Sequence, residues 1–126
     1  MTLQVELVSP ERILYSGEAD MVVCRTVAGG EVAFLTGHAP FLAALDPGVV
    51  RVKTSGGDEV VAAVHGGFVE VRDDRVIVLS DVAELAKDID VSRAERAKDS
   101  ASGDDEEAVA ARARAEARLN AAKRAS

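Results

Sequence analysis

The chain has 126 residues, which is enough for one ordinary domain with a small appendage but not for two full-sized domains. Hydrophobic residues make up 48% of it and aromatic residues only 3%, so the core must consist of Val, Leu, Ile and Ala. The net charge of −7 argues against a general affinity for nucleic acid or an anionic membrane surface, because phosphate binding draws on clustered Lys and Arg. We therefore expect protein partners and no nucleic acid.

The N-terminal segment and the single cysteine bear on the compartment. Residues 1–11 alternate apolar and polar and contain Glu6, which suits neither a signal peptide nor an Arg-rich transit peptide. Cys24 cannot form an internal disulfide, which fits a reducing compartment. No apolar run approaches the roughly 20 residues that span a bilayer, so we expect no direct membrane insertion and only indirect membrane association.

From the N-terminus to about residue 80, apolar and polar residues alternate with period two, and turn residues recur. Val50 and Val52 share one face while Arg51 and Lys53 share the other, which is typical of a strand that covers a core on one side. The pattern therefore predicts an antiparallel β-sandwich over 1–82. Its expected strands are 3–8, 12–16, 19–27, 31–35, 41–45, 49–54, 59–65, 67–72 and 75–80, with hairpin turns at 55–58 and 73–74.

After about residue 81, Ala, Glu, Lys and Arg replace the β-branched runs, which predicts a helical segment over 83–126. Asp90 is expected to cap a helix over 91–101, with Ser92 and Glu95 as an alternative capping box, and Gly103 lies in the break that follows. Asp104 is then expected to cap a second helix over 105–124. The fold class predicted is a mainly β N-terminal sandwich followed by a C-terminal antiparallel α-helical hairpin.

The predicted helices have thin apolar faces made mostly of methyl groups. Burial of one methyl contributes only about 0.8 kcal/mol, so such a hairpin should dock weakly and be able to leave its domain as a switch. The expected seam consists of Val91, Ala94, Ala97 and Ala101 on the first helix and Ala108, Ala111, Ala115, Leu119 and Ala122 on the second.

The signatures of nucleotide-hydrolysing, dinucleotide-binding, serine-hydrolase and zinc-protease sites are missing from the sequence, so we expect no catalytic residues. His38 and His65 are the only imidazoles, and a metal site would need a further ligand beside them. A small metal-dependent β-sandwich enzyme centred on these histidines is one alternative. The other interpretation of His38 is a polar residue in the chain reversal of 37–40.

Several segments, in order along the chain, resemble the epsilon subunit of bacterial F-type ATP synthase. The matching segments are GGEVAFLTGHAPFL over 29–42, then Leu45 and Gly48, GGFVEV over 66–71, VIVLS over 76–80, and Ala83-Glu84 with DIDVSRA over 88–94. Members of this family consist of a β-sandwich followed by a helical hairpin.

The resemblance implies a non-catalytic rotor subunit of the proton-translocating ATP synthase, with no required cofactor. Its sandwich would couple the gamma subunit to the membrane c-ring, at the cytoplasmic face of the bacterial cell membrane. Its extended hairpin would reach the alpha and beta subunits through basic residues such as Arg112 and Lys123 and inhibit ATP hydrolysis. Residues implied at the stalk and c-ring contact are Glu31, Gly37, His38, Ala39 and Pro40; a solvated loop acid is the alternative interpretation of Glu31.

Some bacterial members bind ATP as a regulatory ligand in the folded hairpin through an I/L-D-x-x-R-A motif and arginines of the second helix. Residues 89–94 fit that motif, while one further basic position of those members is Ser100 here, so the binding should be weak. A hairpin folded at Gly103 brings the predicted arginines near one another, although Arg93 could instead pair with Asp90. The implied site consists of Glu84, Ile89, Asp90, Arg93, Ala94, Arg114 and Arg118. A stand-alone nucleotide-sensing module is therefore the second alternative.

Overall fold

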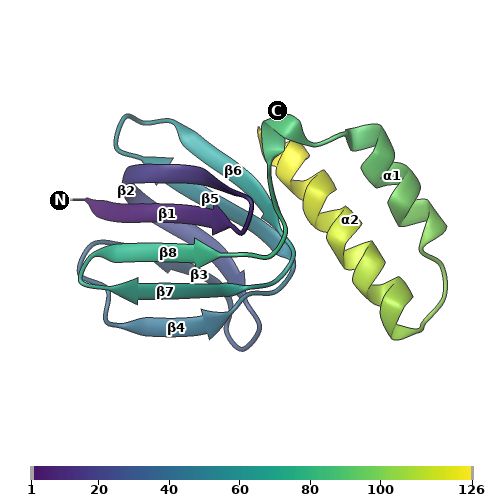
Figure 1. Ribbon diagram of the computed structural model, residues 1–126, viewed down its shortest axis with the longest axis horizontal. Helices are drawn as coiled ribbons and strands as arrows, with labels where there is room; N and C mark the ends of the chain where they lie inside the picture. Colours follow the sequence, from purple (N-terminus) through teal and green to yellow (C-terminus); the bar gives the residue numbers. More distant parts are fainter. Residues whose placement is uncertain (1, 126) are drawn as a thin grey trace.

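The computed structural model describes residues 2–125, which form a β-sandwich followed by a helical hairpin (Figure 1). The predicted fold class is therefore confirmed. The strands are β1 (Leu3–Ser9), β2 (Arg12–Thr26), β3 (Gly30–Phe34), β4 (Phe41–Ala44), β5 (Gly48–Thr54), β6 (Glu59–Val64), β7 (Phe68–Arg72), β8 (Arg75–Leu79) and β9 (Ala83–Leu85), followed by the 3-10 turn η1 (Ala86–Asp88) and the helices α1 (Val91–Ser100) and α2 (Glu106–Ala125).

One folded sheet supplies both layers of the sandwich. Its strand order is β4-β7-β8-β1-β2-β5-β6-β9, with β3 paired to β2, and the β1–β8 pair is parallel. In Figure 1, β1, β8, β7 and β4 form the nearer layer, with β3 and β5 behind them. Between the layers lie the fully buried side chains of Val5, Val22, Val50, Val52 and Phe34, so the core is built mainly of aliphatic residues, as the composition predicts.

The strand predictions are wrong at two places. Residues 12–16 and 19–27 form one strand, β2, which pairs with β1 through its first half and with β5 and β3 through its second. This strand carries the chain from one layer to the other. The side chains that face the core therefore switch midway along it, so the alternation of apolar and polar residues breaks although the chain makes no turn there. Residues 83–85, expected with the hairpin, pair with the edge of β6 as β9. Pairing with an available sheet edge overrides the helical propensity of this short segment.

The hairpin turns occur where the sequence predicts them. Thr54 N donates to Asp58 O at 2.9 Å across the β5–β6 turn, in which Gly57 has φ +95°. Asp73 and Asp74 both adopt positive φ, 50° and 60°, in the β7–β8 turn. Aspartate tolerates this left-handed conformation better than most residues, which explains its use in such turns.

Polar caps begin both helices. Asp90 Oδ1 accepts a hydrogen bond from Arg93 N at 3.0 Å, as predicted, so the alternative box from Ser92 is not used. At the second helix the prediction is wrong by one residue, because Asp105 rather than Asp104 accepts from Ala108 N, at 2.9 Å. Each cap satisfies a backbone N–H that lacks a partner within the helix.

Helix α2 lies against β5 and β6, and α1 packs on α2 (Figure 1). The contact with the sheet is made by Ala117 and Ala121, which pack with Val61, Ala63 and Ala86. Neither alanine belongs to the predicted seam. Alanine occurs all around α2, so periodicity could not identify the face that meets the sheet.

The predicted seam is correct only in part. Ala94 on α1 and Ala115 on α2 are buried, whereas Val91 and Ala97 are exposed. The remaining seam residues, Ala101, Ala108, Ala111, Leu119 and Ala122, are partly buried. The hairpin therefore buries few large side chains, and its weak docking stays a prediction.

Candidate functional site

A cavity of about 400 Å³ lies between the edge of the sheet and the two helices. It collects side chains from β9, η1, α1 and α2 that are far apart in the sequence. Its lining consists of Val82, Glu84, Asp88, Asp90, Arg93, Ala94, Ala97 and Arg118. This cavity therefore combines polar and apolar side chains at a place where the hairpin meets the sandwich.

Five of the predicted ligand residues meet in this cavity, namely Glu84, Asp90, Arg93, Ala94 and Arg118. Two do not line it. Ile89 packs beside the Ala117–Ala121 cluster, and an Arg114 side-chain nitrogen lies 3.7 Å from Glu107 on its own helix. Sequence reasoning did not identify three further lining residues, Val82 before β9, Asp88 of η1 and Ala97 of α1, because the tertiary fold brings these separate elements together.

The two guanidinium groups of the cavity differ in their partners. Arg118 Nε donates to Glu84 Oε1 at 2.5 Å, so its charge is already engaged. Arg93 forms no ion pair with a carboxylate of residues 2–125, and Asp90 accepts from its backbone N–H as the cap of α1 instead. Arg93 is thus the free cation of the cavity within the described chain.

The lining offers both charged and apolar side chains to a ligand. A guanidinium presents several N–H donors that match phosphate oxygens, and Val82, Ala94 and Ala97 offer an apolar surface. With the carboxylates of Glu84, Asp88 and Asp90 against the guanidiniums of Arg93 and Arg118, the formal charge of the lining is −1. An anionic ligand would therefore bind weakly unless a cation accompanied it.

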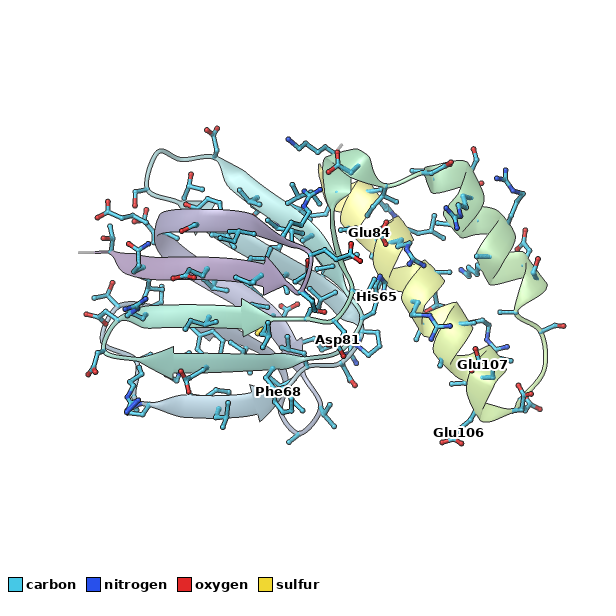
Figure 2. The ribbon with its side chains drawn as sticks, in the orientation of Figure 1. His65, Phe68, Asp81, Glu84, Glu106 and Glu107 are labelled. Atoms are coloured by element: carbon cyan, nitrogen blue, oxygen red, sulfur yellow. The ribbon has the colours of Figure 1, made fainter. Side chains whose placement is uncertain are left out.

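His65 lies beneath α2, next to this cavity, and Figure 2 shows it together with Glu84 between the sheet and the helix. Its side chain is 2% exposed, and its Nε2 is 3.5 Å from Glu84 Oε1. The contact is long and is not a hydrogen bond, so neither ring nitrogen has a hydrogen-bond partner in the part of the chain described. Burial, reinforced by Arg118, lowers the pKa of His65 below its usual 6.5.

His38 has different surroundings, which is evidence against the metal-enzyme alternative. Its ring packs edge-on against Phe34 and Phe41, with centroid distances of 5.0 and 5.9 Å, and its Nδ1 is 2.7 Å from Ala39 O. His65 shares none of these neighbours. Residues 2–125 contain no group of three His, Cys, Asp or Glu side chains that could hold a metal ion.

The loop between β3 and β4 presents most of the residues predicted to contact the stalk. Gly37, at φ +86°, donates from its N–H to Asp74 Oδ1 at 2.7 Å, which ties the loop to the β7–β8 turn. Gly37, Ala39 and Pro40 are exposed. These residues form a small, well-positioned surface at one end of the sandwich.

Glu31 lies apart from that loop. It is the second residue of β3 and lines a second cavity, of about 430 Å³, together with Glu116 and Asn120 of α2. Phe34 ends the strand and precedes the loop, so most of the length of β3, roughly 10 Å, separates Glu31 from the loop. The predicted contact residues therefore form two groups.

Comparison with known proteins agrees with this architecture. A family model described as ATP synthase, Delta/Epsilon chain, beta-sandwich domain matches residues 2–86. The chain belongs to this family, and the resemblance found in the sequence is confirmed. Membership makes it a non-catalytic component of an ATP-synthesising complex.

The relatives match over nearly their whole length. The ATP synthase epsilon chain of Streptomyces griseus subsp. griseus is 48% identical, with 94% of both chains covered. That of Thermobifida fusca is 54% identical, with 96% of this chain and 92% of the relative covered. A chain in a structure of the Euglena gracilis mitochondrial ATP synthase superposes with a TM-score of 0.73 at 24% identity, over 97% of this chain and 78% of that one. This superposition supports the fold.

Neither helix of residues 2–125 has the length and apolar sequence that crossing a membrane requires.

Proposed function

We propose that this chain is a rotor subunit that couples gamma to the c-ring and inhibits ATP hydrolysis through its hairpin, at the cytoplasmic face of the bacterial membrane. The observation that carries the proposal is the contrast between a rigid sandwich and a hairpin held by little apolar surface. Ala117 and Ala121 each bury a methyl group, which contributes about 0.8 kcal/mol.

The polar contacts that hold the hairpin are also weak. Arg118 pairs with Glu84, and Arg124 Nε lies 3.3 Å from Glu59 Oε1. Partly exposed ion pairs of this kind contribute about 0–1 kcal/mol each. Release would therefore cost little, and it would free Arg118 to meet acidic surfaces of the alpha and beta subunits.

Copurification tests the rotor assignment. The full chain is expected to bring down a gamma subunit and, with it, the c-ring, because the sandwich supplies a preformed surface at 37–40. A stand-alone nucleotide sensor would bring down neither. The sandwich surface is unaffected by Arg93→Ala, so that variant serves as a matched control that should copurify like the parent.

We further propose that the cavity between β9 and the hairpin binds ATP as a regulatory ligand. Arg93 supports this because it lines the cavity and forms no ion pair with a carboxylate of residues 2–125. Glu84 and Asp90 place acceptors opposite it. The negative lining and Ser100 both predict weak binding, and a divalent cation would reduce the charge repulsion.

Arg93→Ala is expected to weaken ATP binding by about 1.5–3 kcal/mol, because a charged hydrogen bond to phosphate is lost. Calorimetry with ATP and Mg²⁺ on the purified chain measures this. Arg96→Ala removes the same charge from α1 at a position outside the cavity lining, so it should leave the affinity nearly unchanged. An equal loss of ATP affinity in both variants would show that the overall positive charge of α1, and not a contact by Arg93, attracts the ligand. Absence of ATP binding by the parent chain would exclude the site.

A further inference from the structure

The surface buried by docking of the hairpin contains a histidine without a satisfactory partner. His65 follows β6, and its backbone N–H is satisfied by Val82 O at 3.1 Å. Its ring is 2% exposed, and neither ring nitrogen is hydrogen-bonded within residues 2–125. A buried polar atom without a partner is costly, so a histidine here weakens docking unless it serves another purpose.

The charges around the ring come from two elements. Strand β9 contributes Glu84, whose Oε1 is 3.5 Å from Nε2, and helix α2 contributes Arg118 and Arg114. The same Glu84 oxygen accepts from Arg118 Nε at 2.5 Å, so its negative charge is largely engaged. An added proton on His65 would thus be buried beside two guanidinium groups and one shared carboxylate.

Departure of α2 would remove each of the effects that oppose protonation of His65. It would expose the ring to water and carry both guanidiniums away. It would also free Glu84 to accept a hydrogen bond from the imidazolium, since Glu84 lies on β9 and His65 directly follows β6, the strand with which β9 pairs. The docked state therefore excludes the proton, and the released state accommodates it.

We propose that His65 couples hairpin docking to pH, so that the hairpin stays against the sandwich while the ring is neutral and is released when the ring takes up a proton. The proposal rests on the release of the hairpin in the proposed function. Its direction follows from linkage. The pKa of His65 is lowered below 6.5 in the docked state and returns to that value or above it in the released state.

Docking is therefore fully favoured above about pH 6.5 and weakens as the pH falls toward the docked pKa. A single proton changes the docking equilibrium at most tenfold per pH unit, or about 1.4 kcal/mol. Acidification would shift the chain toward the extended, inhibitory hairpin.

A donor–acceptor dye pair on Ser55→Cys and Ser102→Cys measures docking in the full chain, since both positions are exposed, one on the β5–β6 turn and one at the end of the hairpin. Cys24 remains unlabelled because burial raises the pKa of its thiol to about 12. Between pH 7.5 and 5.5, we expect docking to weaken by up to tenfold per unit. His65→Gln should abolish this pH dependence, whereas His38→Gln, which removes the other histidine, should preserve it.

Ring-proton NMR of His65 in the unsubstituted chain provides a second readout that does not depend on the folding of a variant. A pKa below 6.5 in the docked chain supports the proposal. A pKa at or above 6.5, a fixed dye separation across this range, or an unchanged pH dependence in His65→Gln would each overturn it. These measurements use the isolated chain. The pH proposal can therefore fail while the rotor and inhibitor assignment holds, and the assignment can fail while the pH proposal holds.

Discussion

A chain that ends at Asp88 is expected to assemble with gamma as the full chain does and to raise ATP hydrolysis by the enzyme several-fold. This truncation keeps all strands including β9, and the main core lies entirely within the retained residues. It removes α1 and α2, and with them every basic residue proposed to meet the alpha and beta subunits. Only the hairpin, the element proposed to inhibit ATP hydrolysis, is lost.

The position of the truncation matters for its interpretation. Ending the chain at about residue 80 would also remove β9 and leave the edge of β6 unpaired, which favours association with other strands. The measurement is the steady-state ATPase rate of complexes reconstituted with full-length or shortened chain. Equal rates at equal subunit content would remove the inhibitory role from this protein while leaving its rotor role intact.

Gly67→Ala is expected to lower the free energy of unfolding by more than about 3 kcal/mol. An added Cβ would lie 2.0 Å from Leu79 O and 2.7 Å from Ser80 Cα, and Gly67 has φ +114°. Both obstacles are backbone atoms, so no side-chain rotation relieves the clash. The Gly67 carbonyl also accepts from Leu45 N at 2.9 Å, which means that a shift of this segment disturbs the chain directly after β4 as well.

Gly66→Ala is the matched control because Gly66 also has positive φ, +98°, but nothing lies within 4 Å of its added Cβ. It should lower the free energy of unfolding only by the cost of placing alanine in the left-handed conformation, about 1–2 kcal/mol. Urea unfolding followed by circular dichroism measures both variants. Similar losses of stability in the two variants would show that glycine is required at 67 because of its backbone conformation and not because the backbone of Leu79 and Ser80 lies so close.

Much of the fold was predictable because its signals are local. The alternation of Val50 and Val52 with Arg51 depends only on the strand period, and the cap by Asp90 depends on residues within one turn. The ligand motif at 89–94 was likewise visible as a contiguous segment. Its residues Asp90, Arg93 and Ala94 do line one cavity in the structure.

The corrections concern features that depend on contacts between distant segments. Strand β9 forms because β6 offers an edge, and Ala117 and Ala121 meet the sheet because α1 occupies another side of α2. None of these outcomes is encoded in the neighbouring residues.

The sequence by itself determined the class of fold, the glycine and aspartate turns, the break before Asp105 and the weakly apolar hairpin, since each follows from local propensity and composition. Only the tertiary structure decided that Glu84 binds Arg118, that Arg93 remains unpaired within the described chain, and that His65 is buried beneath α2. Those facts depend on which surfaces cover one another, and burial changes the free energy of a charge far more than its neighbours in sequence do.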